Sequence, residues 1–361
     1  MLASIKRSVL FAAAKSGLLR ATLKSGWRSR RLLILCYHGI SLDDEHLWRP
    51  GLYMSATLFR RRMEILKRMG AAVLGIDEGL TRLYAGTLPK GSVAITFDDG
   101  NYDFYQAAMP ILQEFGFPAT AYLTTYYMDY NRPVFDPMCR YLLWKGGEER
   151  LFRWDPIVPD EVRLDEGGRN QAAAQIMEYA ARERLSGPEK DDLLAALAKV
   201  LCVDYAGLCS RRLLHLMTPA EVREAHTRGI DIELHTHSHR VPREESGFRR
   251  QVLTNRARIR EVIGVECRHF CYPSGQYEPE FVKWLQSYGI RSATTCDAGI
   301  ASAGSNALLL PRLLDGGGLS DVAFEAWVAG VGAMLPQRRR REGPRERPGP
   351  AKQAPQFQDG R

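Results

Sequence analysis

Two adjacent carboxylates follow an apolar run in the segment Thr96-Phe97-Asp98-Asp99-Gly100. Residues 93–97 are predicted to form a buried strand, and side chains alternate in direction along a strand, so Asp98 and Asp99 are expected to point different ways. One carboxylate can then bind a cation while the other faces a reacting centre. A plain Asp-Asp-Gly turn with solvated carboxylates is the alternative interpretation.

A second polar segment, His235-Thr236-His237-Ser238-His239, follows the apolar run 230–234. Three of the protein's eight histidines within five residues are difficult to ascribe to surface chance. If the segment enters a helical turn, His235 and His239 share one face, which is the spacing that two imidazoles need to meet one metal ion. His237 is expected to point elsewhere.

A third segment, Tyr272-Pro273-Ser274-Gly275, ends a predicted strand at 269–272. It predicts a tight turn whose backbone N–H groups and tyrosine ring could line a sugar site. Tyr272, Ser274 and Gly275 are therefore candidate substrate-binding residues. Turns of the Pro-x-Gly type are common, so this segment supports a sugar site only in combination with the other two segments.

Strand-like and helix-like runs alternate along most of residues 32–335, which favours an α/β fold with a parallel sheet, either open or closed into a barrel. The carboxyl ends of parallel strands form the ligand face of such folds. The three polar segments should therefore converge. The predicted strands are 32–36, 71–74, 93–97, 119–124, 230–234, 269–272 and 291–295, and helices are predicted at 57–69, 103–115, 244–263 and 278–288.

The three motifs, in this order, resemble those of the polysaccharide deacetylases, that is, carbohydrate esterase family four or the NodB-homology domain. The resemblance covers residues 32–330 in outline and implies a distorted (β/α) barrel with one divalent metal ion, usually zinc, held by one Asp and two His. Carried over, it makes Asp99, His235 and His239 the metal ligands and Asp98 the catalytic base. A nitrogen-rich ligand set favours zinc without excluding nickel or cobalt.

The implied activity is hydrolytic removal of N-acetyl groups from an amino sugar of a polysaccharide or of its lipid-linked precursor. The expected partner is thus an N-acetylated carbohydrate. Two alternatives stay open: a catalytically silent carbohydrate-binding protein on the same fold, and a deformylase or other amide hydrolase. The sequence contains no phosphate-binding GxxxxGK[ST] motif, no GxGxxG after a strand and no GxSxG nucleophile turn.

The sequence departs from the family pattern at two places. Many members carry an arginine that tethers the base where Cys271 stands; Arg312 is the candidate substitute, because Leu310-Pro311-Arg312 resembles the late strand of a branch that acts in polysaccharide biosynthesis. Many also carry a late histidine as general acid, which is missing. His38, in a segment that resembles the opening strand of the same branch, is the candidate acid; the alternative is a structural histidine. His269 is predicted to be structural.

The charge distribution argues against a nucleic-acid-binding protein, and the cysteine content indicates free thiols. The formal charge is +8, but residues 1–31 hold eight Lys or Arg and no acid (+8), and residues 336–361 hold eight against three acids (+5). Subtracting 13 from 8 leaves −5 for residues 32–335, so a nucleic-acid groove is not expected. Seven cysteines without a CxxC motif favour buried thiols, including Cys36 and Cys271, in a reducing compartment.

The remaining segments frame the predicted domain. Residues 1–31 carry a helical apolar stripe (Ile5, Val9, Leu19, Leu23 and Trp27) beside basic residues, typical of an amphipathic helix on an anionic membrane surface, or else of a helix packed on the domain. We expect a cytoplasmic protein, peripheral at the inner membrane face if the first alternative holds. Residues 129–217 are predicted as a helical insertion without strands, and residues 336–361 as a disordered basic tail.

Overall fold

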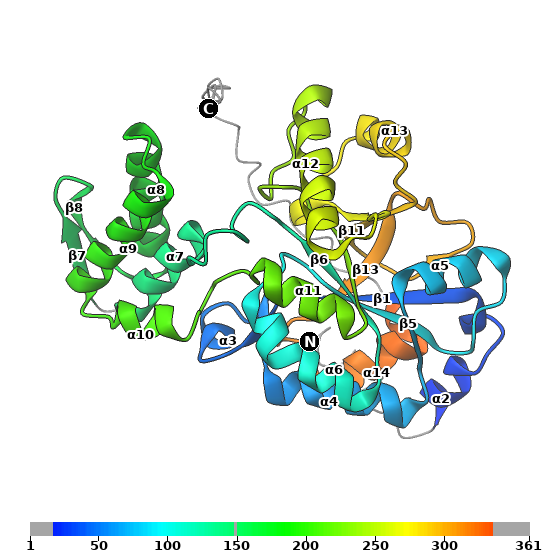
Figure 1. Ribbon diagram of the computed structural model, residues 1–361. Coiled ribbons are helices and arrows are strands. Elements are labelled where there is room, and N and C mark those ends of the chain that lie inside the picture. The colour runs from blue at the N-terminus through cyan, green and yellow to red at the C-terminus, as the bar shows by residue number, and fades with distance from the viewer. Residues whose placement is uncertain (1–16, 148–149, 335–361) are drawn as a thin grey trace.

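The computed structural model describes residues 17–147 and 150–334. Seven parallel strands close into a barrel, because the last strand of the series, β5, pairs back onto β1 and sets Ile95 beside Leu35 (Figure 1). This confirms the predicted (β/α) barrel. Around the barrel the strands follow the order β1 (Arg31–Tyr37), β13 (Leu310–Leu314), β11 (Ser292–Ala298), β10 (His269–Cys271), β9 (Ile230–Leu234), β6 (Ala119–Leu123) and β5 (Ser92–Phe97).

Shorter strands extend the barrel wall or lie beyond it. Strand β4 (Ala72–Leu74) runs parallel to β5, and β12 (Ala301–Ser302) pairs antiparallel with β1. Strands β2 (Gly39–Ser41) and β3 (Tyr53–Ser55) form a separate parallel pair in the segment that follows β1. This segment leaves the barrel at the carboxyl end of β1, on the same side as the predicted site.

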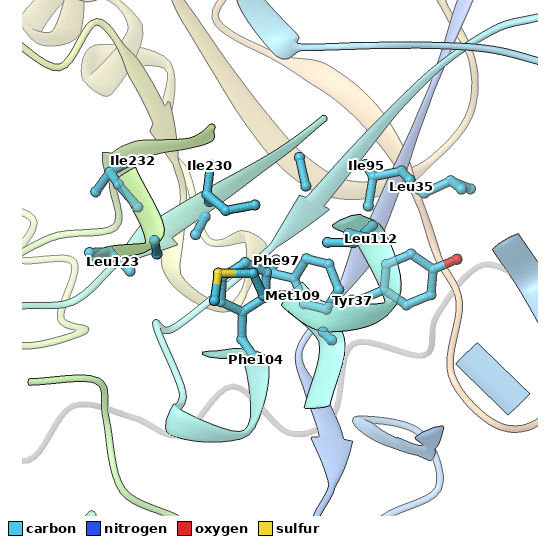
Figure 2. Packing of buried hydrophobic residues seen from close by; sticks show 14 of the residues in the cluster. Leu35, Tyr37, Ile95, Phe97, Phe104, Met109, Leu112, Leu123, Ile230 and Ile232 are labelled. Atoms are coloured by element: carbon cyan, nitrogen blue, oxygen red, sulfur yellow. The ribbon is translucent and has the colours of Figure 1, made fainter. Parts of the chain in front are cut away.

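Strands β1 and β5 are almost continuously apolar because both of their faces are covered. Phe97 points outward and packs on Phe104 and on Tyr37, with ring centroids 4.7 and 5.3 Å apart (Figure 2). Its neighbours Thr96 and Asp98 point into the barrel. The alternation along one strand therefore directs hydrophobic rings to the covering helices and polar groups to the interior.

Helices cover the outside of the barrel, and local sequence signals explain their ends. Ser55 caps the first of them with its side chain, and Gly70 ends it in the left-handed region. The covering helices are α4 (Ala56–Met69), α5 (Ile76–Ala85), the π-helical turn η2 (Phe104–Ala108) with α6 (Met109–Phe115), α11 (Pro219–Thr227), α12 (Glu245–Ile263), α13 (Pro279–Ser287), α14 (Asp321–Ala329) and α15 (Val331–Met334).

The segment between β6 and α11 projects from the barrel and has a hydrophobic core of its own (Figure 1). It contains α7 (Phe135–Lys145), β7 (Leu151–Trp154), β8 (Val158–Arg163), α8 (Glu166–Arg182), α9 (Gly187–Leu201) and α10 (Tyr205–Ser210). The prediction of an insertion without strands is wrong, since β7 and β8 form an antiparallel hairpin. These strands are short, half exposed and contain Pro159, so they lack the apolar alternation that marks a strand.

The described part of the N-terminal segment packs on the domain. Leu19 and Leu23 of α2 (Leu18–Leu23) are buried, and Leu19 contacts Ala326 and Ala329 of α14. These two leucines therefore do not face a membrane, which corrects that part of the predicted stripe. Residues 1–16 and the predicted tail at 336–361 lie outside the described residues. Within residues 17–147 and 150–334, no helix combines the length and apolar character that crossing a membrane requires.

Arg28, in the turn η1 (Arg28–Arg30), closes the amino-terminal end of the barrel. Its guanidinium is fully buried and donates to the carbonyl oxygens of Val328 (2.9 Å), Ser92 (2.8 Å) and Arg31. Burial, and then the charge of Arg31, lower its pKa to about 10, so it stays charged at neutral pH. One side chain thus links the start of β1, the start of β5 and the end of α14.

We expect Arg28→Ala to lower the free energy of unfolding by about 3 kcal/mol, because buried carbonyl oxygens lose a charged donor. Chemical denaturation monitored by circular dichroism measures this loss. Arg30→Ala is the matched control, since its guanidinium is exposed and, among the described residues, bonds only to the nearby Gly26 carbonyl. Equal stability of the two variants would contradict the structural role given to Arg28.

Candidate metal centre and active site

The two carboxylates at the end of β5 diverge, as the alternation of a strand predicts. The backbone N–H of Asp98 still donates to the Tyr37 carbonyl (3.0 Å), whereas Asp99 turns into the left-handed region with φ of 75°. Gly100 follows with φ of 82°, and a Cβ placed on it would lie 2.6 Å from the Leu123 side chain. This tight turn separates the two side chains, so that Asp98 enters the barrel and Asp99 stands at its mouth.

Asn255 of α12 holds the histidine segment that follows β9. Its side-chain carbonyl accepts from the His235 N–H (3.0 Å), and its amide donates to the Leu123 carbonyl (3.0 Å) and to Thr125 Oγ1 (3.1 Å). Asn255 is completely buried. It therefore fixes the start of the histidine segment relative to the end of β6.

The histidine segment is not the helical turn that the spacing predicted. It is a series of bends in which Thr236 and His239 adopt left-handed backbone angles, with φ of 64° and 56°. His235 and His239 still converge, with ring centroids 5.0 Å apart. His237 points away, as expected, and its Nδ1 bonds with Thr125 Oγ1 (2.9 Å).

Asp99, His235 and His239 come together at the mouth of the barrel. The Nε2 atoms of both histidines lie 3.3 Å from Asp99 Oδ1, and one ligand atom from each residue lies within 4.8 Å of the others. Neither contact has hydrogen-bond geometry, so Asp99 Oδ1 is buried without a hydrogen-bond partner. A buried carboxylate oxygen left unpaired is costly, and a cation shared with two imidazoles would satisfy it.

The tautomer of His235 fits the same interpretation. Its Nδ1 lies 2.8 Å from the Cys271 carbonyl oxygen, which can only accept, so Nδ1 carries the proton. The lone pair is then on Nε2, which faces Asp99. Histidines that bind metal characteristically donate their other ring N–H in this way. The three residues therefore fit a divalent metal ion such as zinc.

Asp98 is paired inside the barrel with Arg312 of β13. Both carboxylate oxygens accept from the guanidinium, at 2.7 Å from Nη1 and 2.7 Å from Nη2, and both side chains are buried. Burial alone raises the pKa of Asp98, but the charge and hydrogen bonds of Arg312 outweigh it and hold that pKa well below its usual value. Asp98 is thus ionised at neutral pH and fixed in direction.

Two thiols complete the surroundings of Asp98. Cys36 Sγ and Cys271 Sγ lie 3.5 and 3.4 Å from Asp98 Oδ2, and Arg312 Nη2 donates to Cys271 Sγ at 3.1 Å. Burial raises the pKa of Cys36 well above its usual value, so its S–H is available as a donor. Sequence reasoning assigned both cysteines to the core. Both cysteines lie near the carboxyl ends of predicted strands, at positions whose side chains point into the barrel. This placement is the sequence signal that could have assigned them to the surroundings of Asp98.

His38 lies next to Asp98 and reaches the surface. Its Nε2 is 3.8 Å from Asp98 Oδ2, and its side chain is 17% exposed. Gly39, which follows it, has no room for a side chain, because a Cβ there would lie 2.1 Å from the Tyr53 ring. His38 is therefore held between a buried carboxylate and solvent, where a group that exchanges protons could act.

The turn after β10 differs from the prediction in where it places the ring of Tyr272. Tyr272 is completely buried and its hydroxyl donates to the Leu308 carbonyl (3.1 Å), so the expectation that its ring binds sugar is wrong. The ring points outward because it lies one position after the inward-facing Cys271. Ser274 is exposed with φ of 55°, and Gly275, at φ of 69°, lies so close to Cys296 that a Cβ would approach its Cβ to 2.6 Å.

His269 lies away from this cluster, at the start of β10. Its Nδ1 bonds with Ser292 Oγ (2.7 Å) and its Nε2 lies 3.2 Å from Asp77 Oδ1. Burial lowers its pKa to about 4, which keeps it neutral. These contacts are those of a structural histidine.

Comparison with known proteins gives one match to a family model, described as polysaccharide deacetylase, over residues 85–293. A segment of 72 residues is 36% identical to the poly-beta-1,6-N-acetyl-D-glucosamine N-deacetylase of Staphylococcus aureus, and a segment of 67 residues is equally identical to the enzyme of that name from Staphylococcus epidermidis. These segments cover 20% and 19% of the chain and only 25% and 23% of the relatives.

Solved structures extend the likeness to most of the barrel. A structure titled as the deacetylase PplD of Streptococcus pyogenes in complex with acetate matches with a TM-score of 0.55 and 18% identity, over 85% of this chain and 99% of that one. IcaB from Ammonifex degensii matches with a TM-score of 0.52 and 17% identity, over 84% and 97%. At these identities the two likenesses show a shared fold.

We expect His235→Ala to lose the bound metal at neutral pH, because only two ligands remain. Elemental analysis of the dialysed protein gives the stoichiometry. His237→Ala is the matched control and should keep the metal, since His237 contacts Thr125 and not the cluster. Unchanged metal content in His235→Ala would overturn the ligand assignment.

Proposed function

The chain belongs to the polysaccharide deacetylase family, and we propose that it is a metal-dependent hydrolase that removes N-acetyl groups from an amino sugar of a polysaccharide or of its lipid-linked precursor. The observation that best supports this proposal is that a set of metal ligands and a candidate catalytic base lie side by side at the mouth of the barrel. Asp99, His235 and His239 form a three-residue ligand set, and Asp98 stands beside them as an ionised carboxylate held by Arg312. Membership of the family does not by itself imply that this chain retains both the ligand set and the base.

The number of protein ligands at this site is consistent with a catalytic role. Three protein ligands are typical of a catalytic rather than a structural metal site, because further coordination positions stay available. When bound there, a divalent ion lowers the pKa of a coordinated water and polarises the amide carbonyl. Zinc is the proposed ion because imidazole nitrogens dominate the set.

Asp98 is the proposed proton acceptor. It takes a proton from the water whose oxygen attacks the amide carbon, and Arg312 keeps the carboxylate ionised and oriented until then. A backbone N–H near Ser274 is proposed to donate to the oxygen that becomes negative as the carbonyl is attacked. The bond from the carbonyl carbon to the sugar nitrogen then breaks, which yields acetate.

His38 is the proposed general acid. The departing sugar nitrogen needs a proton, and His38 lies 3.8 Å from Asp98 and is open to solvent on its other side. A proton that Asp98 accepts could therefore pass through His38 to the amine. This assignment fills the place of the late histidine that the sequence lacks.

The substrate proposal follows the names of the relatives. Two of them are named poly-beta-1,6-N-acetyl-D-glucosamine N-deacetylases, although the matched segments span about a quarter of their length. We therefore propose β-1,6-linked N-acetylglucosamine oligomers as the first substrates to assay, beside N-acetylated glycolipids. A silent carbohydrate-binding protein would bind these without releasing acetate, and a deformylase would release formate from N-formyl analogues instead.

The cellular location is a separate proposal. We propose a cytoplasmic protein that contacts an anionic membrane through residues 1–16, which hold Lys6, Arg7 and Lys15 and no acid. Such contact would bring the barrel near a lipid-linked substrate.

Deleting residues 2–16 should therefore release the protein from anionic liposomes, since each basic residue near such a surface contributes about 1 kcal/mol. Sedimentation at low salt measures this, with neutral liposomes as the control. If the full chain does not sediment with anionic liposomes, the proposed contact is wrong.

Asp98→Asn should keep the metal but lower acetate release by about 10²–10⁴-fold, which is the scale of a positioned base. Acetate release from N-acetylglucosamine oligomers, with metal content measured in parallel, provides the test. Asp43→Asn, an exposed carboxylate on the loop after β2, is the control and should be fully active. Near-normal turnover by metal-loaded Asp98→Asn would show that another group takes the proton.

A further inference from the structure

A hollow of about 400 Å³ lies between the helix α3 (Glu45–Trp48), in the segment after β1, and the projecting insertion. In Figure 1, α3 stands between the barrel and helices α7 and α10 of the insertion. The side chains that give the hollow its character are Trp48, Arg49, Arg140, Trp144, Arg169 and Asn170. None of them belongs to the site described above.

The aromatic part of the hollow is rigid. Trp48 packs edge-on against Tyr141 with ring centroids 5.3 Å apart, and Trp144 stacks on the same tyrosine at 5.8 Å. The Tyr141 hydroxyl in turn donates to Asp44 (2.6 Å). Two indoles held by one buried tyrosine present preformed apolar surface beside polar groups, which is the usual composition of a small-ligand site.

The polar part is rich in guanidinium groups. Three arginines line the hollow against a single carboxylate, Glu166. Arg140 is anchored by Asp136 (2.8 Å) and Asn170 (3.3 Å), and Arg169 by the Leu164 carbonyl (2.8 Å). Both guanidinium groups are therefore held in place by protein groups where they line the hollow.

Arg49 differs from the other two arginines. It is exposed, and its guanidinium lies 5.1 Å from the centre of the Trp48 ring. Within the described ranges 17–147 and 150–334, no carboxylate lies at ion-pair distance from it. Its donors are therefore available to an anionic group that sits over the indole.

Two aromatic rings connect the hollow to the segment that carries His38. Trp48 lies beside Tyr53, with ring centroids 6.0 Å apart, and the Tyr53 ring fills the space over Gly39. Gly39 directly follows His38. A ligand in the hollow is thus separated from the proposed general acid by the rings of Trp48 and Tyr53, on the side of the barrel where its strands end.

We propose that this hollow is a second carbohydrate subsite, which binds a sugar residue that carries an oxyanion and lies further along the substrate than the N-acetyl group being removed. The sugar ring would cover an indole, and the oxyanion would accept hydrogen bonds from Arg49. A phosphate on the sugar and the carboxylate of a uronic acid share this chemistry. The inference rests on the proposed function, because it assumes a glycan substrate.

Binding, not turnover, tests the subsite. We would use calorimetry to titrate Asp98→Asn protein, which should not consume its ligands. The ligands are N-acetylglucosamine 1-phosphate, a glucuronic acid–N-acetylglucosamine disaccharide, the neutral N,N′-diacetyl form of chitobiose, and inorganic phosphate. The phosphate and carboxylate ligands distinguish the two sources of the oxyanion. At least one of the two should bind more tightly than both chitobiose and inorganic phosphate.

Adding Arg49→Ala should weaken binding of that anionic sugar about tenfold, the scale of one charge-assisted hydrogen-bonded pair, and leave chitobiose unaffected. Arg153→Ala is the matched control, since this exposed arginine of the insertion pairs with Asp155 outside the hollow. Unchanged affinity in Arg49→Ala, or equal affinity for inorganic phosphate and the sugar phosphate, would overturn the subsite. Because no turnover is measured, neither result depends on whether the barrel deacetylates its ligand.

Discussion

The ion pair between Asp98 and Arg312 is the interaction on which the rest of the site depends. Its two charges are buried inside a closed barrel, where breaking such a pair by removing one partner costs about 3–5 kcal/mol. Arg312 is satisfied further by the Thr295 carbonyl (2.9 Å) and Thr96 Oγ1 (3.3 Å). The pair therefore joins β5, β11 and β13 and fixes the direction of Asp98. Asp99, one residue later, is left free to face the histidines.

Among the described residues of the barrel, unusual backbone geometry gathers at the same end, although further examples lie in the insertion. Asp99, Thr236, His239 and Ser274 are all non-glycine residues in the left-handed region. Each such conformation costs on the order of 1–3 kcal/mol and persists only where surrounding structure imposes it. Here hydrogen bonds to Asn255 and Gln251 of α12 hold the histidine segment in place. The barrel stores this strain where ligand groups must converge, and not in its apolar lower half.

The barrel strands and the segments that connect them have different roles in the molecule. The barrel core and the insertion core are separate hydrophobic clusters, and the strands that hold Asp98 and His235 belong to the first of them. Trp48 and Tyr53, in the segment after β1, pack against the insertion while Gly39 of the same segment borders the active site. Reaction chemistry thus belongs to the strand ends, and the surface that would select a substrate belongs to the connections.

The sequence by itself determined the alternation of strands and helices, and with it the parallel sheet and the strand ends that carry Asp98, Asp99 and His235; that the sheet closes into a barrel is implied only by the family resemblance. The sheet and the strand ends follow from local periodicity and from the rule that parallel strands share a carboxyl face. It also indicated that His235 and His239 would meet, although by a helical turn that the structure replaces with left-handed bends. These bends are held by hydrogen bonds to Asn255 and Gln251 of α12, 13 to 20 residues further along the chain, so local spacing could not reveal them.

The resemblance made Arg312 the candidate tether of Asp98, but only the tertiary structure decided how that arginine reaches it and that two thiols lie beside the same carboxylate. The closing pair of β1 with β5 sets Cys36 beside Asp98, and the pairing of β13 with β1 delivers Arg312 from 214 residues away. Whether a strand residue faces the barrel interior or a covering helix depends on closure and register, which no stretch of local sequence contains. For the same reason the sequence predicts Cys271 in the core and Tyr272 at a sugar site, whereas the structure turns Cys271 toward Asp98 and Tyr272 away from the active site.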